Sequence, residues 1–210
     1  MKQKKIYYYL IFVSCLTMTA RLSAQEFITR WNLTNPGSSS TSIGFEVTTI
    51  DTVYYTWETI PAGISGTGTF SGTFATITGL PINAIIRLKI DSTNFKGFRI
   101  NYGADRKRIV DVEQWGTVVW SSMESAFKGC DSLQITASDV PNLSSVSNMY
   151  SMFSLATTFN SPIGNWNVDS VTNMAYMFEG ASSFNQPIDT WNTINVSNMY
   201  SMFYYASSFN

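Results

Sequence analysis

A motif that recurs every 25 residues in the C-terminal half constrains the fold more than any other feature of the sequence. The segments that begin at Val146, Val171 and Val196 share the pattern V-[ST]-N-M-x-x-M-F, and Phe-Asn pairs at 159, 184 and 209 keep the same spacing. A weaker copy begins at Trp120, one residue off the period. Periods of 20 to 50 residues are the signature of units that stack on one another and bury a shared core. We therefore expect a solenoid over residues 113–210, cut off within its last unit.

Each unit has two hydrophobic periodicities. Trp166 and Val168 alternate with polar residues, which predicts a short strand. Met174, Met177 and Phe178, with Ala181, follow helical spacing and predict a short helix with Asn173 as its cap. The Met and aromatic columns are expected in the core rather than in a cofactor site. The repeated Asn residues are expected to bond turn backbone.

The preceding segment, residues 25–112, has the pattern of a separate β domain. Val53/Tyr55/Trp57, Ile86/Leu88/Ile90 and Phe98/Ile100/Tyr102 alternate with polar residues, and Gly/Ser/Thr-rich spans separate these runs. Short strands at this spacing predict a β-sandwich of immunoglobulin-like or related type. The expected fold class is thus mixed α/β, with a β-sandwich followed by a leucine-rich-repeat-like solenoid that has one strand and one helix in each unit.

The N-terminus has the organisation of a secretory signal. Three lysines precede an apolar stretch from Ile6 to Met18, and small residues follow, which predicts a signal peptide over residues 1–24 with cleavage between Ala24 and Gln25. Lipidation at Cys15 is a weaker alternative. The apolar stretch is too short to be a membrane span. The mature chain is therefore expected to be secreted or displayed on a bacterial cell surface, without a transmembrane span.

Charge and residue types narrow the function classes. The chain has no His, which removes the usual activated nucleophiles and the commonest transition-metal ligand. Residues 1–24 hold four of its 13 basic and none of its 14 acidic residues, so the mature net charge is −5. No Lys or Arg follows Lys128, which disfavours nucleic-acid binding. The basic cluster 106–108 is interpreted as a solvated loop. Cys130 is the only mature cysteine and is expected to be a buried apolar residue.

The repeat resembles that of the BspA-like leucine-rich-repeat surface proteins, in the branch whose unit reads V-[ST]-N-M-x-x-M-F-x-x-A-x-x-F-N-x-P-I-x-x-W-N. The unit from Val171 to Asn192 matches this pattern along its length. The resemblance implies export, surface display and adhesion or partner binding, and it carries no catalytic residues. It implies a host or matrix protein as the partner.

We therefore expect a binding protein that is not an enzyme and needs no metal or cofactor. The candidate ligand contacts are side chains that the core does not use, namely Tyr150, Tyr176, Tyr200, Asn167, Asp169, Asn192 and Ile194. Replacing Tyr176 and Tyr200 with Ser is expected to weaken capture without unfolding the chain. A glycan-binding module of a surface polysaccharide system and a purely structural spacer stay open. A glycosidase-type carboxylate pair among Asp169, Glu179 and Asp189 is the remaining enzymatic option, and each is interpreted as a solvated charge.

Overall fold

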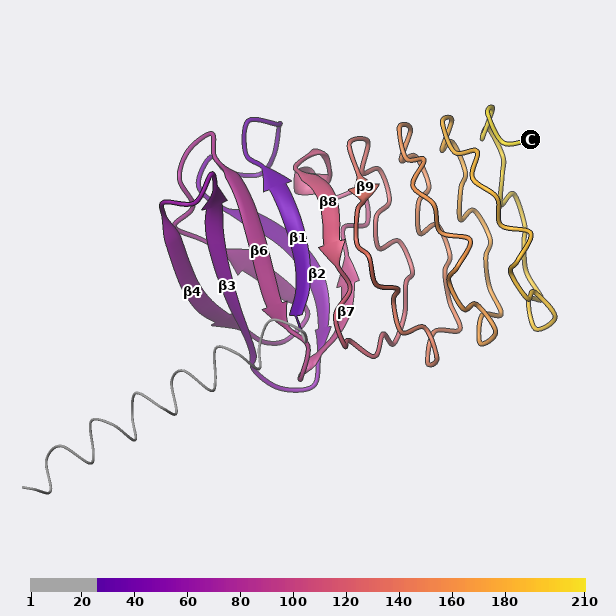
Figure 1. Ribbon diagram of the computed structural model, residues 1–210, viewed down its shortest axis with the longest axis horizontal. Coiled ribbons are helices and arrows are strands. Elements are labelled where there is room, and N and C mark those ends of the chain that lie inside the picture. The colour runs from indigo at the N-terminus through magenta and orange to yellow at the C-terminus, as the bar shows by residue number, and fades with distance from the viewer. Residues whose placement is uncertain (1–25) are drawn as a thin grey trace, which may run out of the picture.

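The computed structural model describes residues 26–210, which form a β-sheet part at one end and a stack of repeated turns at the other (Figure 1). The predicted signal peptide, its cleavage between Ala24 and Gln25, and Cys15 lie outside the described residues. Within 26–210 the chain forms nine strands and one short 3-10 helix. These are β1 (Glu26–Asn32), β2 (Ile43–Thr49), β3 (Val53–Ile60), β4 (Ser65–Phe70), β5 (Phe74–Ile77), β6 (Ile85–Asp91), β7 (Phe95–Arg99), η1 (Ala104–Lys107), β8 (Ile109–Gln114) and β9 (Gln134–Ile135).

Two sheets enclose the first core. The larger has the order β4-β3-β6-β1-β8-β9 and the smaller the order β5-β2-β7. Rings from facing sheets meet between them, as where Trp31 of β1 lies 5.7 Å from Phe45 of β2. Ile86, Leu88 and Ile90 are fully buried, as their alternation predicts. The prediction that Tyr102 continues the alternation of Phe98 and Ile100 is wrong, because Tyr102 lies after the end of β7, has a φ of 62° and is half exposed.

The prediction of a mixed α/β fold, with one strand and one helix in each repeat unit, is wrong. The described residues contain no α-helix, and the segment around Met174–Ala181 is a run of consecutive turns. The only strand within the units is the two-residue β9 of the first one. Between units, pairing is limited to isolated bridges such as Asn148 with Asn173. The structure is therefore nearly all β-strand and turn.

Backbone hydrogen bonds show why no helix forms. In the second unit every other N–H donates to a carbonyl of the next unit, and the four bonds are Met149 N to Asn173 O (2.9 Å), Ser151 N to Ala175 O (3.0 Å), Phe153 N to Met177 O (2.8 Å) and Leu155 N to Glu179 O (2.7 Å). The N–H groups between them close turns within the unit, as from Met152 to Met149. A helix would direct all of these donors to carbonyls four residues earlier in its own segment. Stacking therefore competes directly with helix formation and replaces it.

The turn run reproduces the burial pattern of a helix. Left-handed residues recur four positions apart, at Ser151 and Leu155 in the second unit and at Tyr176 and Gly180 in the third. Between the latter two, Met177 and Phe178 are fully buried, as are Met174 before them and Ala181 after them. The i, i+3, i+4, i+7 spacing thus identified the buried residues correctly and the backbone conformation wrongly.

Stacked columns of identical side chains fill the core of the units. Phe127, Phe153, Phe178 and Phe203 lie one above another with ring centroids 5.5 to 5.7 Å apart and nearly parallel planes. Each of the last three units adds a second Phe from the 159/184/209 column about 4 Å from the first. The expectation that the Met and aromatic columns form the core is confirmed for the buried members, and Met199 of the last unit is 44% exposed.

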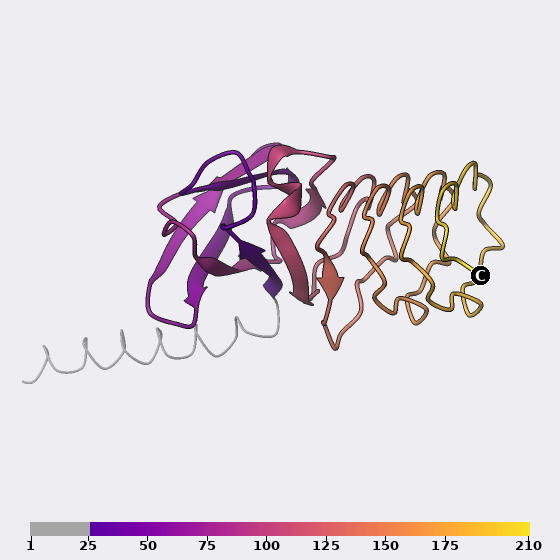
Figure 2. The same ribbon diagram turned by 90° about the horizontal axis from the view of Figure 1, so that it is seen from above.

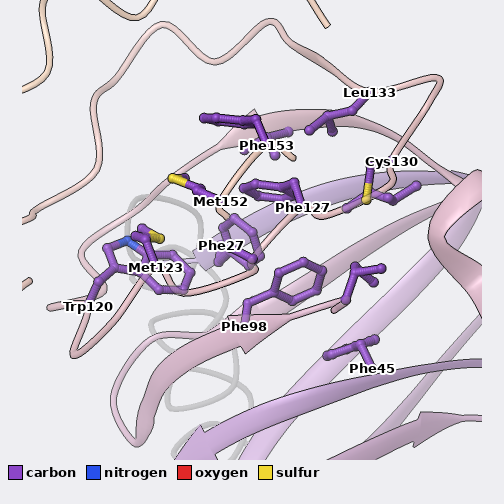
Figure 3. Close-up of a cluster of buried hydrophobic side chains, with 14 of the residues drawn as sticks. Phe27, Phe45, Phe98, Trp120, Met123, Phe127, Cys130, Leu133, Met152 and Phe153 are labelled. Atoms are coloured by element: carbon purple, nitrogen blue, oxygen red, sulfur yellow. The ribbon is translucent and has the colours of Figure 1, made fainter. Parts of the chain in front are cut away.

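The sheets and the repeat units share one continuous core (Figure 3). Phe27 and Phe98 from the sheets lie beside Trp120 and Phe127 from the first unit, with Phe27–Trp120 and Phe98–Phe127 centroids 5.0 and 5.5 Å apart. Cys130 is buried in the same cluster, as expected.

Both sheets also continue into the first unit through backbone bonds. The larger sheet does so through the parallel pairing of β8 with β9. On the other side, Ile100 N donates to Ala126 O and Tyr102 N to Lys128 O. Seen from above, the stack extends straight on from the sheets (Figure 2).

The basic cluster is not a solvated loop. Arg108 is buried and paired with Asp105 at 3.2 Å, and it also donates to the carbonyls of Asn35 and Ser42. Asp105 in turn accepts from the Ser38 N–H and hydroxyl and from the Gly44 N–H. This pair fixes the loop between β1 and β2 on the rest of the β-sheet part.

Candidate functional site

Five tyrosines gather on the turn segments of the last three units. This tyrosine patch consists of Tyr150, Tyr176, Tyr200, Tyr204 and Tyr205. Tyr176 packs edge-to-face against Tyr150 and Tyr200, with centroids 5.6 and 5.3 Å apart. Tyr204 and Tyr205 are in contact at 4.1 Å. Edge-to-face packing holds such rings in fixed orientations and leaves their hydroxyls available for hydrogen bonds.

The register of the repeat places these tyrosines in four different columns. Tyr150 and Tyr200 share one column, whereas Tyr176 occupies the next one, where the other units have Ser125, Ser151 and Ser201. Tyr205 stands where two other units have Gly129 and Gly180. The one-residue offset of Tyr176 is what allows its ring edge to meet a tyrosine above and another below.

Tyr176 and Tyr205 both have left-handed backbone conformations. Their φ angles are 56° and 59°, close to those of Ser151, Ser201 and Gly180 in the equivalent columns. For a bulky residue this conformation costs about 1–2 kcal/mol relative to right-handed backbone, and glycine avoids that cost. The turn imposes this conformation on other side chains too, such as Leu155 and Ser201, and only glycine adopts it without the cost.

The patch is exposed and has no basic residues near it in sequence. Tyr200, Tyr204 and Tyr205 are 53–71% exposed, and Tyr150 and Tyr176 are half-buried. Glu179 lies beside them and accepts a hydrogen bond of 3.1 Å from the Ser154 hydroxyl. Partial desolvation, together with the neighbouring Tyr200, raises the pKa of Tyr176 above its ordinary value. The Tyr176 hydroxyl is therefore neutral at physiological pH.

The other predicted contacts lie on a different segment of each unit. Asn167 and Asn192 each accept a bond from the N–H two residues on, which belongs to Asp169 and Ile194 respectively. The Asn192 amide also donates to the Asp169 carboxylate at 2.9 Å. Asn167 and Asn192 thus stabilise turns, the Asp169 carboxylate links its unit to the next one, and Ile194 is exposed at 82%. The structure does not show them combining with the tyrosines into one site.

Sequence reasoning missed Tyr204 and Tyr205. The signal that could have identified them is their place in the repeat, because they stand where the third unit has Glu179 and Gly180. A charged side chain such as that of Glu179 is almost never fully buried, so an aromatic residue at the same position of another unit is expected to reach solvent.

The Asn column that precedes the tyrosines fixes the turns that present them. Asn148, Asn173 and Asn198 each accept from the N–H two residues later, at 2.9 to 3.1 Å. The Asn173 amide donates to the Asn148 carbonyl oxygen, and the Asn148 amide donates to the Glu124 carboxylate. The expectation that these residues bond turn backbone is confirmed, and the ladder also links one unit to the next.

The three carboxylates considered for hydrolysis have separate surroundings. Glu179 bonds Ser154, Asp169 bonds Asn192, and Asp189 is exposed at a shallow hollow beside Trp166 and Pro187. Within residues 26–210 no group of three or more Cys, Asp or Glu side chains is arranged to hold a metal ion.

Comparison with known proteins gives one partial match. The profile of a family described as "Mycoplasma protein of unknown function, DUF285" matches residues 110–210, which is the repeat part of the chain together with all but the first residue of β8. Searches of curated proteins and of solved structures give no match. Over residues 26–210 the chain also forms no helix of the length and apolarity needed to cross a membrane.

Proposed function

We propose that this chain is an exported bacterial binding protein and that its tyrosine patch is the docking surface for a partner protein. The observation that carries this proposal is the gathering of five tyrosines on the turn segments of the last three units, in two groups of touching rings of which three rings are 53–71% exposed. Clustered exposed aromatic side chains of this kind mark protein–protein interaction sites. Adhesion or matrix attachment is the role in which such a surface would serve.

The chemistry of the patch favours a protein partner. Tyrosine offers a large apolar ring and a polar hydroxyl at small conformational cost, and it is enriched among the residues that dominate interface energetics. Two edge-to-face contacts of Tyr176 and one tilted contact between Tyr204 and Tyr205 pre-organise the rings before binding. The neighbouring Glu179 and the absence of Lys and Arg after Lys128 favour a partner segment that is neutral or basic.

The test is a binding screen of the purified protein against an array of host extracellular-matrix proteins, read by biolayer interferometry. The main variant replaces Tyr176 and Tyr200 with Ser, and a second one is Tyr205→Gly. Each replacement removes a ring, and Tyr176→Ser and Tyr205→Gly restore the residue that other units carry at the same position. We expect each tyrosine contact to contribute about 2 kcal/mol, so Kd should rise about 30-fold for the loss of one ring and about a thousandfold in the double variant.

Tyr54→Ser is the matched control, because Tyr54 is 65% exposed on β3, away from the repeat units. Its affinity should stay at that of the parent protein, and all variants should keep the parent melting temperature to within a few degrees. The assignment of the site is refuted if the double variant binds as tightly as the parent protein, or if Tyr54→Ser loses as much affinity as the double variant does.

Two other outcomes decide between the remaining roles. Capture of glycans by the tyrosine patch, without capture of any protein, would replace the proposal with a glycan-binding module. Capture of neither class would favour a structural spacer. Release of reducing sugar from a polysaccharide by the same preparation would show an enzyme, with Asp169, Glu179 and Asp189 as the first residues to replace.

A further inference from the structure

A second surface with the features of a binding site lies on the outer face of the small sheet β5-β2-β7. Three side chains stand directly opposite one another across its strands: Phe74 of β5 pairs with Glu46 of β2, and Glu46 pairs with Arg99 of β7. The row continues into the first repeat unit, where Arg99 donates to Glu124 at 3.2 Å. We call Phe74, Glu46, Arg99 and Glu124 the sheet row.

Phe74 forms an exposed apolar platform at one end of this row. It lies on the outer face and is 56% exposed, although a ring of this size is usually buried. Gly44 of the neighbouring strand makes room for it, because a Cβ at Gly44 would lie only 2.9 Å from the tip of the ring. One side of the ring therefore rests on the sheet backbone and the other faces solvent.

Glycines open a hollow on each side of the row. On the Gly97 side a hollow of about 320 Å³ is lined by Thr48, Thr73 and Ser122 together with Glu46, Arg99 and Glu124. On the Gly44 side a hollow of about 230 Å³ is lined by Phe74, Thr76 and Asn101 together with Glu46. Glu46 borders both hollows. These volumes lie at or below the small end of ligand pockets, so each hollow suits one small ring rather than a large ligand.

The polar groups of the row alternate in hydrogen-bonding character. The Glu46 and Glu124 carboxylates accept, and the Arg99 guanidinium between them donates. Asn101 adds an amide beside Glu46. A ligand that both donates and accepts at adjacent positions matches such a row, and vicinal hydroxyl groups have this property. The two carboxylates outnumber the one guanidinium, so the row repels anions.

We propose that this face binds a neutral oligosaccharide. One sugar ring would lie with its C–H face on Phe74, and its hydroxyls would bond Glu46 and Asn101. A neighbouring sugar would enter the larger hollow and bond Arg99, Glu124 and the hydroxyls that line it. The site stands independently of the tyrosine patch and adds a second binding activity to the chain.

The site combines two parts of the chain, because Ser122 and Glu124 belong to the first repeat unit whereas the other residues belong to the sheet. Packing of the repeat units against the β-sheet part is therefore needed to complete the larger hollow. The polar lining also argues against an apolar peptide as the occupant, since such a peptide would cover the Thr48 and Thr73 hydroxyls without offering them hydrogen bonds.

The test is an array of short neutral gluco-, galacto- and manno-oligosaccharides, with uronic-acid oligosaccharides on the same slide. The strongest neutral ligand is then titrated by calorimetry. We expect neutral sugars to bind and uronic-acid sugars to bind more weakly or not at all. Phe74→Ala should weaken binding about tenfold or more, Phe74→Tyr should keep it, and Glu46→Gln should weaken it about tenfold.

Controls separate this site from the rest of the surface. Tyr54→Ala removes an exposed ring of the larger sheet, and the double variant with Tyr176→Ser and Tyr200→Ser removes two rings of the tyrosine patch. Both variants should leave the affinity for sugar unchanged. Because Phe74 is exposed, its loss should not unfold the chain, which keeps the test decisive if Glu46→Gln proves unstable. The proposal is overturned if no neutral sugar binds, if uronic-acid sugars bind best, if Phe74→Ala binds as the parent does, or if the tyrosine double variant abolishes binding.

Discussion

Replacing Phe127 with Ala tests whether the sheets and the repeat units share one core. Phe127 is 1% exposed and lies in the first repeat unit, where its ring contacts Phe98 of β7, Trp115 and Phe153. Truncation of a buried Phe to Ala costs about 3–5 kcal/mol, which includes the cavity that remains. Three ring neighbours on opposite sides of the junction restrict how far that cavity can collapse. We therefore expect a loss of about 4 kcal/mol.

Urea unfolding followed by tryptophan fluorescence measures this loss. The chain carries tryptophans in the sheets (Trp31, Trp57), at the junction (Trp115, Trp120) and in later units (Trp166, Trp191), so the emission reports on the whole structure. For a chain of this size a slope of about 2–3 kcal/mol/M is expected, so the midpoint should fall by about 1.3–2 M. Phe74→Ala is the control and should shift the free energy of unfolding by less than about 0.5 kcal/mol, because its ring is exposed.

A loss below about 1 kcal/mol for Phe127→Ala, with an unchanged slope, would refute the shared core. So would a transition in which the sheet tryptophans keep the parent midpoint while only the repeat units lose stability. Either result would mean that the two parts are stabilised separately.

Three further predictions concern charge and burial. Burial alone would raise the pKa of Glu113, but hydrogen bonds from Arg87 and Arg30 outweigh burial and lower this pKa. Glu113 therefore stabilises the fold at pH values above the unfolded carboxyl pKa, and this stability is lost as the pH falls through the lowered folded pKa. Glu113→Gln should therefore flatten the acid side of a plot of melting temperature against pH. Burial raises the pKa of the Cys130 thiol well above its usual value. A disulfide reagent should therefore label Cys130 only as fast as the protein unfolds around it, and labelling at the rate of a free thiol would contradict this burial. Asp105→Ala should destabilise the fold by about 3–5 kcal/mol, because it leaves the buried Arg108 without its carboxylate partner. Asp131→Ala breaks the exposed ion pair with Lys107 and should cost less than about 1 kcal/mol. Equal melting temperatures for the two variants would contradict this difference.

The sequence predicts which residues of a repeat unit are buried better than it predicts their backbone. The spacing of Met174, Met177 and Phe178 follows from a segment with one buried side, and both a helix and a run of turns satisfy it. The decisive difference is where the N–H groups of Ser151 and Phe153 donate, and their acceptors lie 24 residues away. Single-segment periodicity carries no information on such long-range bonds. Gly180 and Gly129, four residues after Tyr176 and Ser125, were the local hint of left-handed turns.

The candidate surfaces differ in how far the sequence could locate them. Tyr150, Tyr176 and Tyr200 follow from the repeat, since positions outside the core columns are left for the surface. Asn167 and Asn192 looked equally free, but their amides stabilise turns, a role that depends on local backbone geometry. Phe74, Glu46 and Arg99 come from three strands separated by 25 or more residues, so only the register of the sheet brings them into one row.

The measurement that tests the central claim most directly is hydrogen–deuterium exchange of the protein with and without a captured matrix protein. The account predicts slower exchange in peptides that cover residues 174–180 and 199–205, which carry four of the five tyrosines, and unchanged exchange over β3 and β4. The N–H groups of Tyr176 and Gly180 already donate to the following unit, so the additional protection should be greatest at Tyr200, Tyr204 and Tyr205. Protection confined to the β-sheet part, or none in the tyrosine segments, would contradict the proposal that the repeat units are the docking surface.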